Sequence, residues 1–276
     1  MLLNDIKPSL SLTEVIRLYR IVDFQFDDVA AIPFKAYTPR PEHCLQFYPK
    51  DSEVVKYPGA DLIISGKRTT IIGQHTIVNH RYVGKEFLSF QVVFQPGALF
   101  QLTHISSDEL TNVYMDAEDI FGNEVRLVNE QLFHAGSYAE MVSIMDCFLN
   151  GQIKKYKRDQ HPVDAISKLM IQQKEQFCLD KYIKEACLSH RQFDRKFGER
   201  VGIAPKQFMK VIRFDQAFRM KNRFPDRDWF SIAVHCGYHD YQHLSKDFKE
   251  FTGCTPPQCF KIENRSPERA FGDAEV

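Results

Sequence analysis

One thirteen-residue pattern occurs twice in the last third of the chain, and it limits the possible folds more than any other feature. Residues 193–205 read FDRKFGERVGIAP, and residues 244–256 read LSKDFKEFTGCTP. In both copies two apolar residues four positions apart precede a glycine and then a proline. Side chains four positions apart share one helix face, glycine often ends a helix, and proline suits the first turn of the next. The pattern therefore predicts two similar helices, each followed closely by another helix.

The first copy also contains signals for where its helix begins and which face it exposes. Ser189 is a good N-cap, and Gln192 three residues later completes a capping-box pattern. At about 100° per residue, Arg191 and Arg195 fall opposite the two phenylalanines of the pattern. We therefore expect a helix with a phenylalanine face in the core and an arginine face in solvent.

The second copy follows the same logic. Asp240 is the expected cap, and Gln242 and Lys246 face outward. A short helical segment precedes each copy, FCLDKYIKEAC in one case and WFSIAVHCG in the other. Two short helices joined by a tight turn form a helix-turn-helix. Arg or Lys can donate to guanine and Gln can pair with adenine, so the outward faces predict contact with DNA.

The predicted DNA contacts lie in the first turns of the two repeated helices. They are Ser189, His190, Arg191, Gln192, Asp194, Arg195, Asp240, Tyr241, Gln242, His243 and Lys246. The alternative is that these side chains are only the solvated faces of two amphipathic helices. The matched spacing and the matched caps favour the DNA-binding interpretation.

The distribution of charge agrees with it. The formal net charge is zero, yet residues 1–150 carry 12 Lys and Arg against 19 Asp and Glu. Residues 177–261 carry 16 against 10. A basic segment joined to an acidic one is typical of a nucleic-acid-binding module on a carrier domain.

Residues 175–260 resemble the AraC-type DNA-binding domain, a family with two helix-turn-helix units joined by a long helix. The second unit matches the family signature at Gly237, Tyr238, Asp240, Leu244, Lys246, Phe248, Lys249, Gly253 and Pro256. The sequence RFDQA at 213–217 matches the linking helix. The resemblance implies a transcription regulator that binds double-stranded DNA, with RNA polymerase as a partner if the regulator is an activator.

Three features depart from the family pattern. Lys246 stands where the family usually has an arginine. Arginine can bind a base through two parallel hydrogen bonds, and lysine is not equivalent to it in this role. Cys187 stands where the first turn often has glycine, and Cys259 and Phe260 stand where an aromatic residue and an arginine often follow. The second reading helix is therefore interpreted as an element that positions the domain on DNA.

The first 150 residues favour a β-rich domain with some helices. Segments such as TTIIGQHTIV and EFLSFQVVF are short and rich in β-branched and aromatic residues, so they predict strands. The helical spacing of Leu12, Val15, Ile16 and Tyr19 predicts a helix over residues 11–21. Further helices are expected over residues 106–114, 124–133 and 138–149.

The expected fold class is therefore α+β. A β-rich N-terminal domain, with a cupin-like barrel as one form of it, precedes an all-α C-terminal domain with two helix-turn-helix units. The expected boundaries are 1–150 for a sensor and dimerisation domain, 151–164 for a linker, 165–262 for the AraC-type domain and 263–276 for a flexible tail. The basic run KKYKR (154–158) is either a solvated linker or a contact to DNA phosphates.

The front half also resembles the sensor domains of some AraC-family regulators, through IIGQHT, FQPGALFQL and DELTNVYMDAEDIFG. This resemblance implies a small-molecule effector. A β-rich domain with many aromatic residues can enclose an apolar pocket, and Phe90, Phe94 and Phe100 are candidate wall residues. The helix at 138–149 is a candidate for contact between two copies in a homodimer.

The expected location is the cytoplasm. The seven cysteines form no C-x-x-C pair and their count is odd, which favours a reducing compartment. The first residues, MLLNDIKPSL, lack the pattern of a secretion signal. The most apolar stretch is too short to span a bilayer, so no membrane partner is expected.

Two other classes of protein remain open. One is a metal-dependent cupin-like enzyme with a regulatory DNA-binding tail, but His75, His80 and Glu86 do not have the H-x-H spacing of such a site. Cys236, His239 and His243 resemble zinc spacing but lack an evident fourth ligand. We therefore expect no enzyme activity, no cofactor and no metal. The other class is an architectural protein whose helical half binds protein.

Overall fold

The computed structural model describes residues 2–28, 32–155, 159–172 and 178–271. The strands are β1 (Leu2–Ile6), β2 (Ile16–Gln25), β3 (Lys35–Tyr37), β4 (Cys44–Phe47), β5 (Val54–Lys56), β6 (Ile63–Ile64), β7 (Thr69–Ile72), β8 (Asn79–Tyr82), β9 (Glu86–Phe94) and β10 (Tyr114–Asp116). The helices of the first half are η1 (Leu10–Leu12), α1 (Ala98–Thr103), α2 (Glu118–Phe121), α3 (Asn123–His134) and α4 (Tyr138–Lys155). The second half contains α5 (Pro162–Gln172), α6 (Leu179–Glu185), α7 (His190–Val201), α8 (Pro205–Arg223), α9 (Trp229–His235), α10 (Tyr241–Thr252), α11 (Pro256–Glu263) and η3 (Pro267–Phe271).

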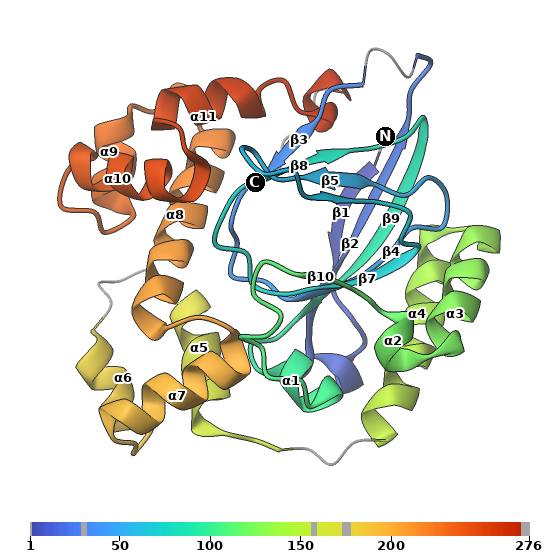
Figure 1. The fold of residues 1–276 in the computed structure, drawn as a ribbon, viewed down its shortest axis with the longest axis horizontal. Helices are drawn as coiled ribbons and strands as arrows, with labels where there is room; N and C mark the ends of the chain where they lie inside the picture. Colours follow the sequence, from blue (N-terminus) through green and yellow to red (C-terminus); the bar gives the residue numbers. More distant parts are fainter. Residues whose placement is uncertain (1, 29–31, 156–158, 173–177, 272–276) are drawn as a thin grey trace.

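Two antiparallel sheets form the N-terminal domain (Figure 1). One has the strand order β1-β2-β9-β4-β7-β10 and the other the order β3-β8-β5-β6. Helices α3 and α4 pack on the larger sheet (Figure 1). A β-rich N-terminal domain and a helical C-terminal domain confirm the predicted α+β class, while the cupin-like form of the first domain stays a prediction.

Strand β9 runs through the centre of the larger sheet and is buried on both faces. Leu88, Phe90 and Val92 pack in the core formed with α3 and α4. Ser89 and Gln91 alternate with them and line a pocket between the sheets. The domain therefore has an apolar layer under its helices and a partly polar interior between its sheets.

The helix predicted over residues 11–21 is wrong. The chain there forms only the short η1 and then β2, which pairs with β1 and β9. A register shift between Ile16 and Leu18 marks a bulge, and Ile16 and Tyr19 both enter the same core. An extra residue in a strand breaks its period of two, so two core residues three positions apart imitated a helix.

The helix predicted over residues 106–114 is also absent. This segment turns and then enters β10, which pairs with β7. Asn112 has a left-handed φ of 61°, and its side chain bonds to both the amide and the hydroxyl of Thr76. These contacts to a distant segment outweigh the local preference for a helix.

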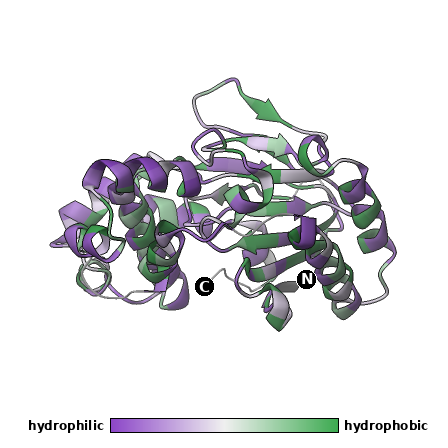
Figure 2. Ribbon diagram, turned by 90° about the horizontal axis from the view of Figure 1, so that it is seen from below, coloured by the Kyte–Doolittle hydropathy of each residue, from purple (hydrophilic) through white to green (hydrophobic). Residues whose placement is uncertain are grey.

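The C-terminal domain is helical, as predicted, and has its own aromatic core. Helices α6 and α7 lie near one end of the long α8, and α9, α10 and α11 lie near its other end (Figure 1). Figure 2 shows hydrophobic residues along many strands and many hydrophilic residues on the helices of this domain. Of the predicted linker, residues 151–155 belong to α4 and residues 162–164 to α5. Tyr156–Arg158 of the basic run lie outside the described residues.

The segment predicted as a flexible tail from residue 263 is folded up to Phe271. It contains the end of α11 and the short η3, while residues 272–276 lie outside the described part. Lys35 of β3 forms ion pairs with Glu263 and Glu268. Composition alone did not predict this, because the partner cation lies more than 220 positions earlier in the chain.

Candidate DNA interface and effector pocket

The first helix-turn-helix unit consists of α6, a tight turn and α7. Ser189 accepts a bond from the Gln192 amide at 3.3 Å, and the Gln192 side chain accepts one from the Ser189 amide at 3.1 Å. This is the predicted capping box. Phe193 and Phe197 are fully buried with ring centroids 5.6 Å apart. They hold one face of α7 in the core.

The opposite face of α7 is exposed as predicted. The predicted contacts in this unit that are solvent-exposed are Ser189, His190, Arg191, Gln192, Asp194 and Arg195. The Arg195 guanidinium lies 3.6 Å from the Glu199 carboxylate, one turn further along α7, and its side chain is 64% exposed. Such an exposed pair contributes less than about 1 kcal/mol, so Arg195 can exchange this partner for a base at little cost.

The second unit, α9 and α10, repeats this arrangement. Asp240 accepts a bond from the His243 amide at 2.7 Å, which confirms it as the cap. Leu244 and Phe248 are fully buried. Of the predicted contacts, Asp240, Gln242 and Lys246 are exposed, whereas Tyr241 and His243 are half-buried. His243 packs edge-on against the Tyr238 ring, so it also has a packing role.

Glycine and proline delimit both repeated helices as the sequence predicted. Gly202 and Gly253 end α7 and α10 with φ of 96° and 72°. Pro205 and Pro256 stand in the first turns of α8 and α11. Each repeated helix is therefore followed by a short, conformationally defined connection to the next helix, which is α8 after the first unit and α11 after the second.

A buried charge fixes α10 on α8. Asp247 lies beneath the exposed face of α10, 3.6 Å from both Lys210 and Arg213. Burial raises the pKa of Asp247, and the two cations oppose that rise. Sequence reasoning missed this residue, because its role depends on a neighbouring helix.

The N-terminal domain supplies hydrogen-bond donors to the C-terminal end of α7. The Ser107 amide donates to the carbonyl of Glu199 at 2.7 Å, and its hydroxyl donates to that of Arg200 at 3.1 Å. Thr111 donates to the Gly202 carbonyl at 2.7 Å. The last carbonyls of a helix have no partner within the helix, so these bonds hold the first unit against the sheet domain.

His43 adds a further bond to this set. We call the contacts of Ser107, Thr111 and His43 with the end of α7 the α7 seam. The Nε2 atom of His43 lies 3.0 Å from the Val201 carbonyl, which can only accept, so Nε2 carries the proton. Burial is the main cause that lowers the pKa of His43 to about 4. The imidazole is therefore neutral at physiological pH.

A buried arginine also belongs to the α7 seam. Arg200 is 1% exposed and binds Asp164 at 2.7 Å and Asp159 at 2.8 Å. Its guanidinium also lies 4.8 Å from the centre of the Phe100 ring. No local pattern indicated this role, since Arg200 follows the exposed arginines of α7 by only one further turn.

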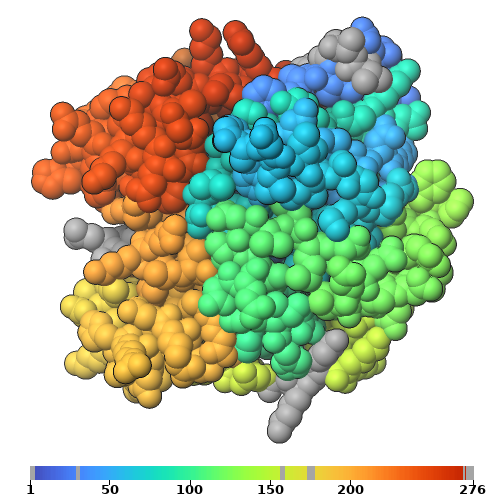
Figure 3. All heavy atoms as spheres, viewed as in Figure 1, coloured from blue at the N-terminus to red at the C-terminus, as the bar shows by residue number. Residues whose placement is uncertain are grey.

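The second unit touches the N-terminal domain at separate points. The Val78 amide donates to the Phe251 carbonyl of α10 at 2.9 Å. Lys35 binds Glu263 at the end of α11 at 2.6 Å. Figure 3 shows the two domains in contact along one continuous boundary. Both units are thus fastened to one sheet domain.

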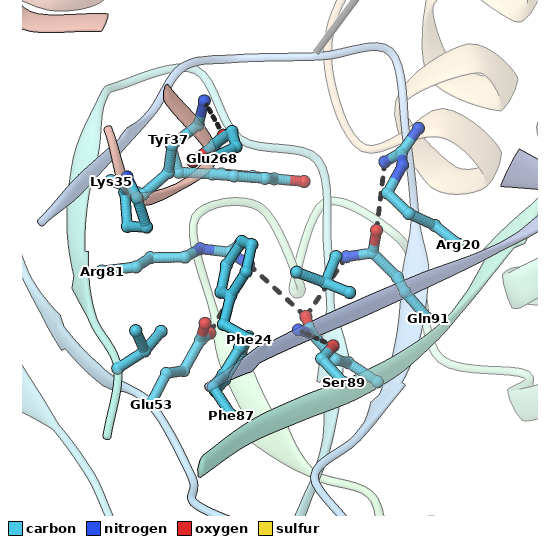
Figure 4. A pocket seen from close by; sticks show the side chains of 14 residues that line it. Arg20, Phe24, Lys35, Tyr37, Glu53, Arg81, Phe87, Ser89, Gln91 and Glu268 are labelled. Atoms are coloured by element: carbon cyan, nitrogen blue, oxygen red, sulfur yellow. Dashed lines mark hydrogen bonds and ion pairs between the residues drawn. The ribbon is translucent and has the colours of Figure 1, made fainter. Parts of the chain in front are cut away.

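The N-terminal domain contains a pocket between its two sheets with a cavity volume of about 70 Å³ (Figure 4). Its walls are Arg20, Val22, Phe24, Lys35, Tyr37, Gln46, Glu53, Arg81, Val83, Phe87, Ser89, Gln91, Pro267 and Glu268. Aromatic and aliphatic side chains alternate with amides and paired charges. This combination suits a small organic molecule that has polar groups.

Charges inside the pocket are paired. Arg81 lies 3.5 Å from Glu53, and its guanidinium is 3.4 Å from the centre of the Tyr37 ring. Burial lowers the pKa of Arg81, but Glu53 and nearby tyrosines outweigh this and hold it well above its usual value. Burial raises the pKa of Tyr37 to about 12. The pocket thus presents a fixed cation and a neutral phenol.

The three predicted wall residues lie elsewhere. Phe90 and Phe94 pack in the core under the helices, and Phe100 contacts Arg200. Neighbouring side chains of a strand point to opposite faces, so Ser89 and Gln91 of β9 reach the pocket while Phe90 does not. All three were predicted to line the pocket, whereas Phe90 and Phe94 form the layer between sheet and helices and Phe100 packs against Arg200.

The histidines considered as metal ligands are separated. His75 is buried beside Tyr114, with a pKa lowered by burial to about 3, and His80 stacks on Phe34. Within the described ranges, no group of three His, Cys, Asp or Glu side chains could hold a metal ion. None of the helices in these ranges combines the length and apolar character needed to cross a membrane.

Two capped helix-turn-helix units on one linking helix define the helical half of this chain as a double helix-turn-helix domain. Residues 182–261 match a family model described as a helix-turn-helix domain, which confirms the predicted AraC-type domain. Within the chain, this domain is therefore assigned to that family.

Curated relatives and a solved structure are also similar. The HTH-type transcriptional activator RhaR of Escherichia coli (strain K12) is 28% identical over 160 residues, covering 57% of this chain and 50% of RhaR. RhaR of Shigella boydii serotype 4 gives the same values. The chain thus matches about half the length of these relatives. A structure of ToxT from Vibrio cholerae aligns over 88% of this chain and 98% of its own, with a TM-score of 0.52 and 11% identity, so it shares the fold.

Proposed function

We propose that this protein is a transcription regulator that binds specific sequences of double-stranded DNA through α7 and α10. The observation that carries the proposal is the repeated unit: each helix is capped, buried on one face and exposed along a polar opposite face. Exposed Arg191, Arg195 and Gln242 are side-chain types that read base edges in the major groove. The name of RhaR, a transcriptional activator, supports the proposal and favours activation.

The pocket between the sheets is the proposed site for a small-molecule effector. It is enclosed by both sheets and combines apolar walls with oriented amides, as ligand sites do. A regulator of this kind acts in the cytoplasm. RNA polymerase is the further partner if the protein activates transcription.

We propose that two copies of the protein meet through residues 138–149 only by way of the polar side of α4. Met141, Met145 and Leu149 are buried in the protein's own core, and Ile144 and Phe148 pack against it. The apolar face of this helix is therefore occupied within one chain.

The experiment that tests DNA reading starts with selection of bound fragments from the genome of the source organism. Binding of the selected operator and of random DNA is then measured for Arg195→Ala. We expect the operator affinity to fall by about 1–3 kcal/mol while the affinity for random DNA changes much less, because a base contact is lost.

The matched control is Arg126→Ala, which removes an exposed arginine from α3 in the other domain. It should leave both affinities unchanged. Equal losses for operator and random DNA would show that Arg195 contacts only the backbone. If no DNA is selected at all, the proposed function itself is wrong.

A further inference from the structure

The last described residues form one side of the proposed effector pocket. Pro267 and Glu268 of η3 are part of its lining, although the other walls belong to the first 91 residues. The Phe271 ring stacks on Phe24, with centroids 5.8 Å apart and planes 3° apart, and it also contacts Phe26. Since Phe24 is itself a wall residue, η3 packs against this side of the pocket, where Figure 4 shows Glu268 beside Lys35.

The same segment is tied to α8 and α11, the two helices that pack against α10 of the second helix-turn-helix unit. It directly follows α11, whose Cys259 is buried in the core of the C-terminal domain. Arg269 donates to the Asn222 side chain of α8 at 3.0 Å. The backbone turns back on itself through the bond from the Ser266 amide to the Glu263 carbonyl at 2.9 Å. A displacement of η3 therefore pulls on α8 and α11.

Lys35 binds on both sides of the segment that links α11 to η3. Its ammonium binds Glu263, the last residue of α11, and Glu268 of η3, and Lys35 also lines the pocket. The side chains of Lys35, Glu263 and Glu268 are 12%, 1% and 7% exposed. Leaving a buried carboxylate without its cation is strongly unfavourable, so the position of Lys35 affects the pocket, η3 and α11 together.

We infer that residues 264–271 are a strap that closes the effector pocket and couples its occupancy to the position of the second helix-turn-helix unit. The inference rests on the proposed function for the identity of what is regulated. A molecule can enter on this side only when η3 lifts, which separates Phe271 from Phe24 and Glu268 from Lys35. The same movement weakens the contact between Lys35 and Glu263 at the end of α11. The open and the closed pocket therefore differ in how firmly α11 is held.

Phe271→Ala in the full chain tests the closing step. Phe271 is 42% exposed, so its removal weakens the stack without opening a core cavity. The probe is 8-anilinonaphthalene-1-sulfonate, which binds apolar surfaces and fluoresces there. Loss of an aromatic pair is expected to make probe binding about threefold to tenfold faster. Phe133→Ala, at a 54% exposed ring on α3, is the control and should leave the rate unchanged.

Hydrogen exchange of backbone amides tests the coupling step in the same variants. Phe271→Ala and Lys35→Met should exchange faster in α11 and β3, whereas amides of α7 should be unchanged. Lys35→Arg keeps the charge and should restore slow exchange. Faster probe binding with unchanged exchange in α11 would overturn the coupling. An unchanged probe rate in Phe271→Ala would overturn the strap altogether.

These readouts require no DNA, so they are separable from the proposed function. If the protein binds no DNA but both readouts change as expected, the strap stands and the regulated activity is another one. If DNA binding is found and neither readout changes, the strap is wrong and the proposed function is unaffected.

Discussion

At the scale of single residues, buried charges decide how the two domains meet. Arg200 stands one helical turn beyond the exposed arginines of α7, yet it points into the α7 seam toward Asp164 and Asp159. A guanidinium that is buried needs such partners, because leaving water without them is costly. Two arginines of one helix thus have opposite roles, Arg195 toward solvent and Arg200 toward the carboxylates of Asp164 and Asp159.

Arg200→Met should destabilise the protein by on the order of 3 kcal/mol, since Asp164 would lose its buried cation. Urea unfolding followed by circular dichroism measures the change. Arg126→Met, an exposed position on α3, should change the free energy of unfolding by less than about 0.5 kcal/mol. Similar small effects at both sites would contradict the importance given to the seam.

Stability should also fall as pH decreases from about 6.5. His43 and His75 have pKa values lowered by burial to about 4 and about 3, so the folded chain keeps them neutral. Below pH 6.5 the unfolded chain binds protons that the folded chain does not, at about 1.4 kcal/mol per pH unit for each histidine. The stabilisation is present above pH 6.5 and is lost progressively toward pH 4.

Urea midpoints between pH 7 and pH 5.5 measure this slope. The amide side chain of His43→Gln can still donate to the Val201 carbonyl. In this variant the change of unfolding free energy with pH should be smaller by the contribution of one histidine, about 1.4 kcal/mol per pH unit. An unchanged slope would mean that His43 titrates normally in the folded protein.

At the scale of elements, the tight turns show how far local sequence decides structure. Cys187 in the first unit and Gly237 in the second both have left-handed φ, 54° and 75°. The sequence predicted the caps Ser189 and Asp240 correctly, because a cap depends on bonds to residues two or three positions away. It failed at β2, where a bulge formed with β9 changed the period of the core residues.

A pair of glycine substitutions tests the backbone argument. Gly237→Ala should destabilise by about 1 kcal/mol, because alanine pays for the left-handed conformation although nothing lies within 4 Å of the added Cβ. Gly198→Ala, inside α7 and equally open, should stabilise by up to about 1 kcal/mol. Thermal unfolding measures both, and effects of the same sign would contradict the assignment.

At the scale of the whole molecule, one sheet domain touches both helix-turn-helix units. It holds the end of α7 through Ser107, Thr111 and His43, and it holds α10 and α11 through Val78 and Lys35. The relative position of the two reading helices is thereby linked to the domain that contains the pocket. Under the proposed function, this arrangement lets an effector influence DNA binding without contacting DNA.

The salt dependence of operator binding should show the contribution of phosphate contacts. The logarithm of affinity should fall linearly with the logarithm of salt concentration, with a slope of about −0.9 for each phosphate contact. Lys246→Ala should weaken operator and random DNA alike and make the slope shallower by about 1, if Lys246 positions α10 on the backbone. Lys85→Ala, exposed on the N-terminal domain, is the control, and a loss of sequence preference in Lys246→Ala would instead assign it to base reading.

The amino-acid sequence by itself determined the helix-turn-helix domain, because caps, glycine stops and buried phenylalanines act over a few residues and leave a regular spacing. Only the tertiary structure decided the register of β2, the polar side of β9 and the partners of Arg200 and Lys35. Each of these depends on a segment far away in the chain, which the local pattern does not contain. The effector pocket, its strap and the α7 seam are products of such long-range contacts.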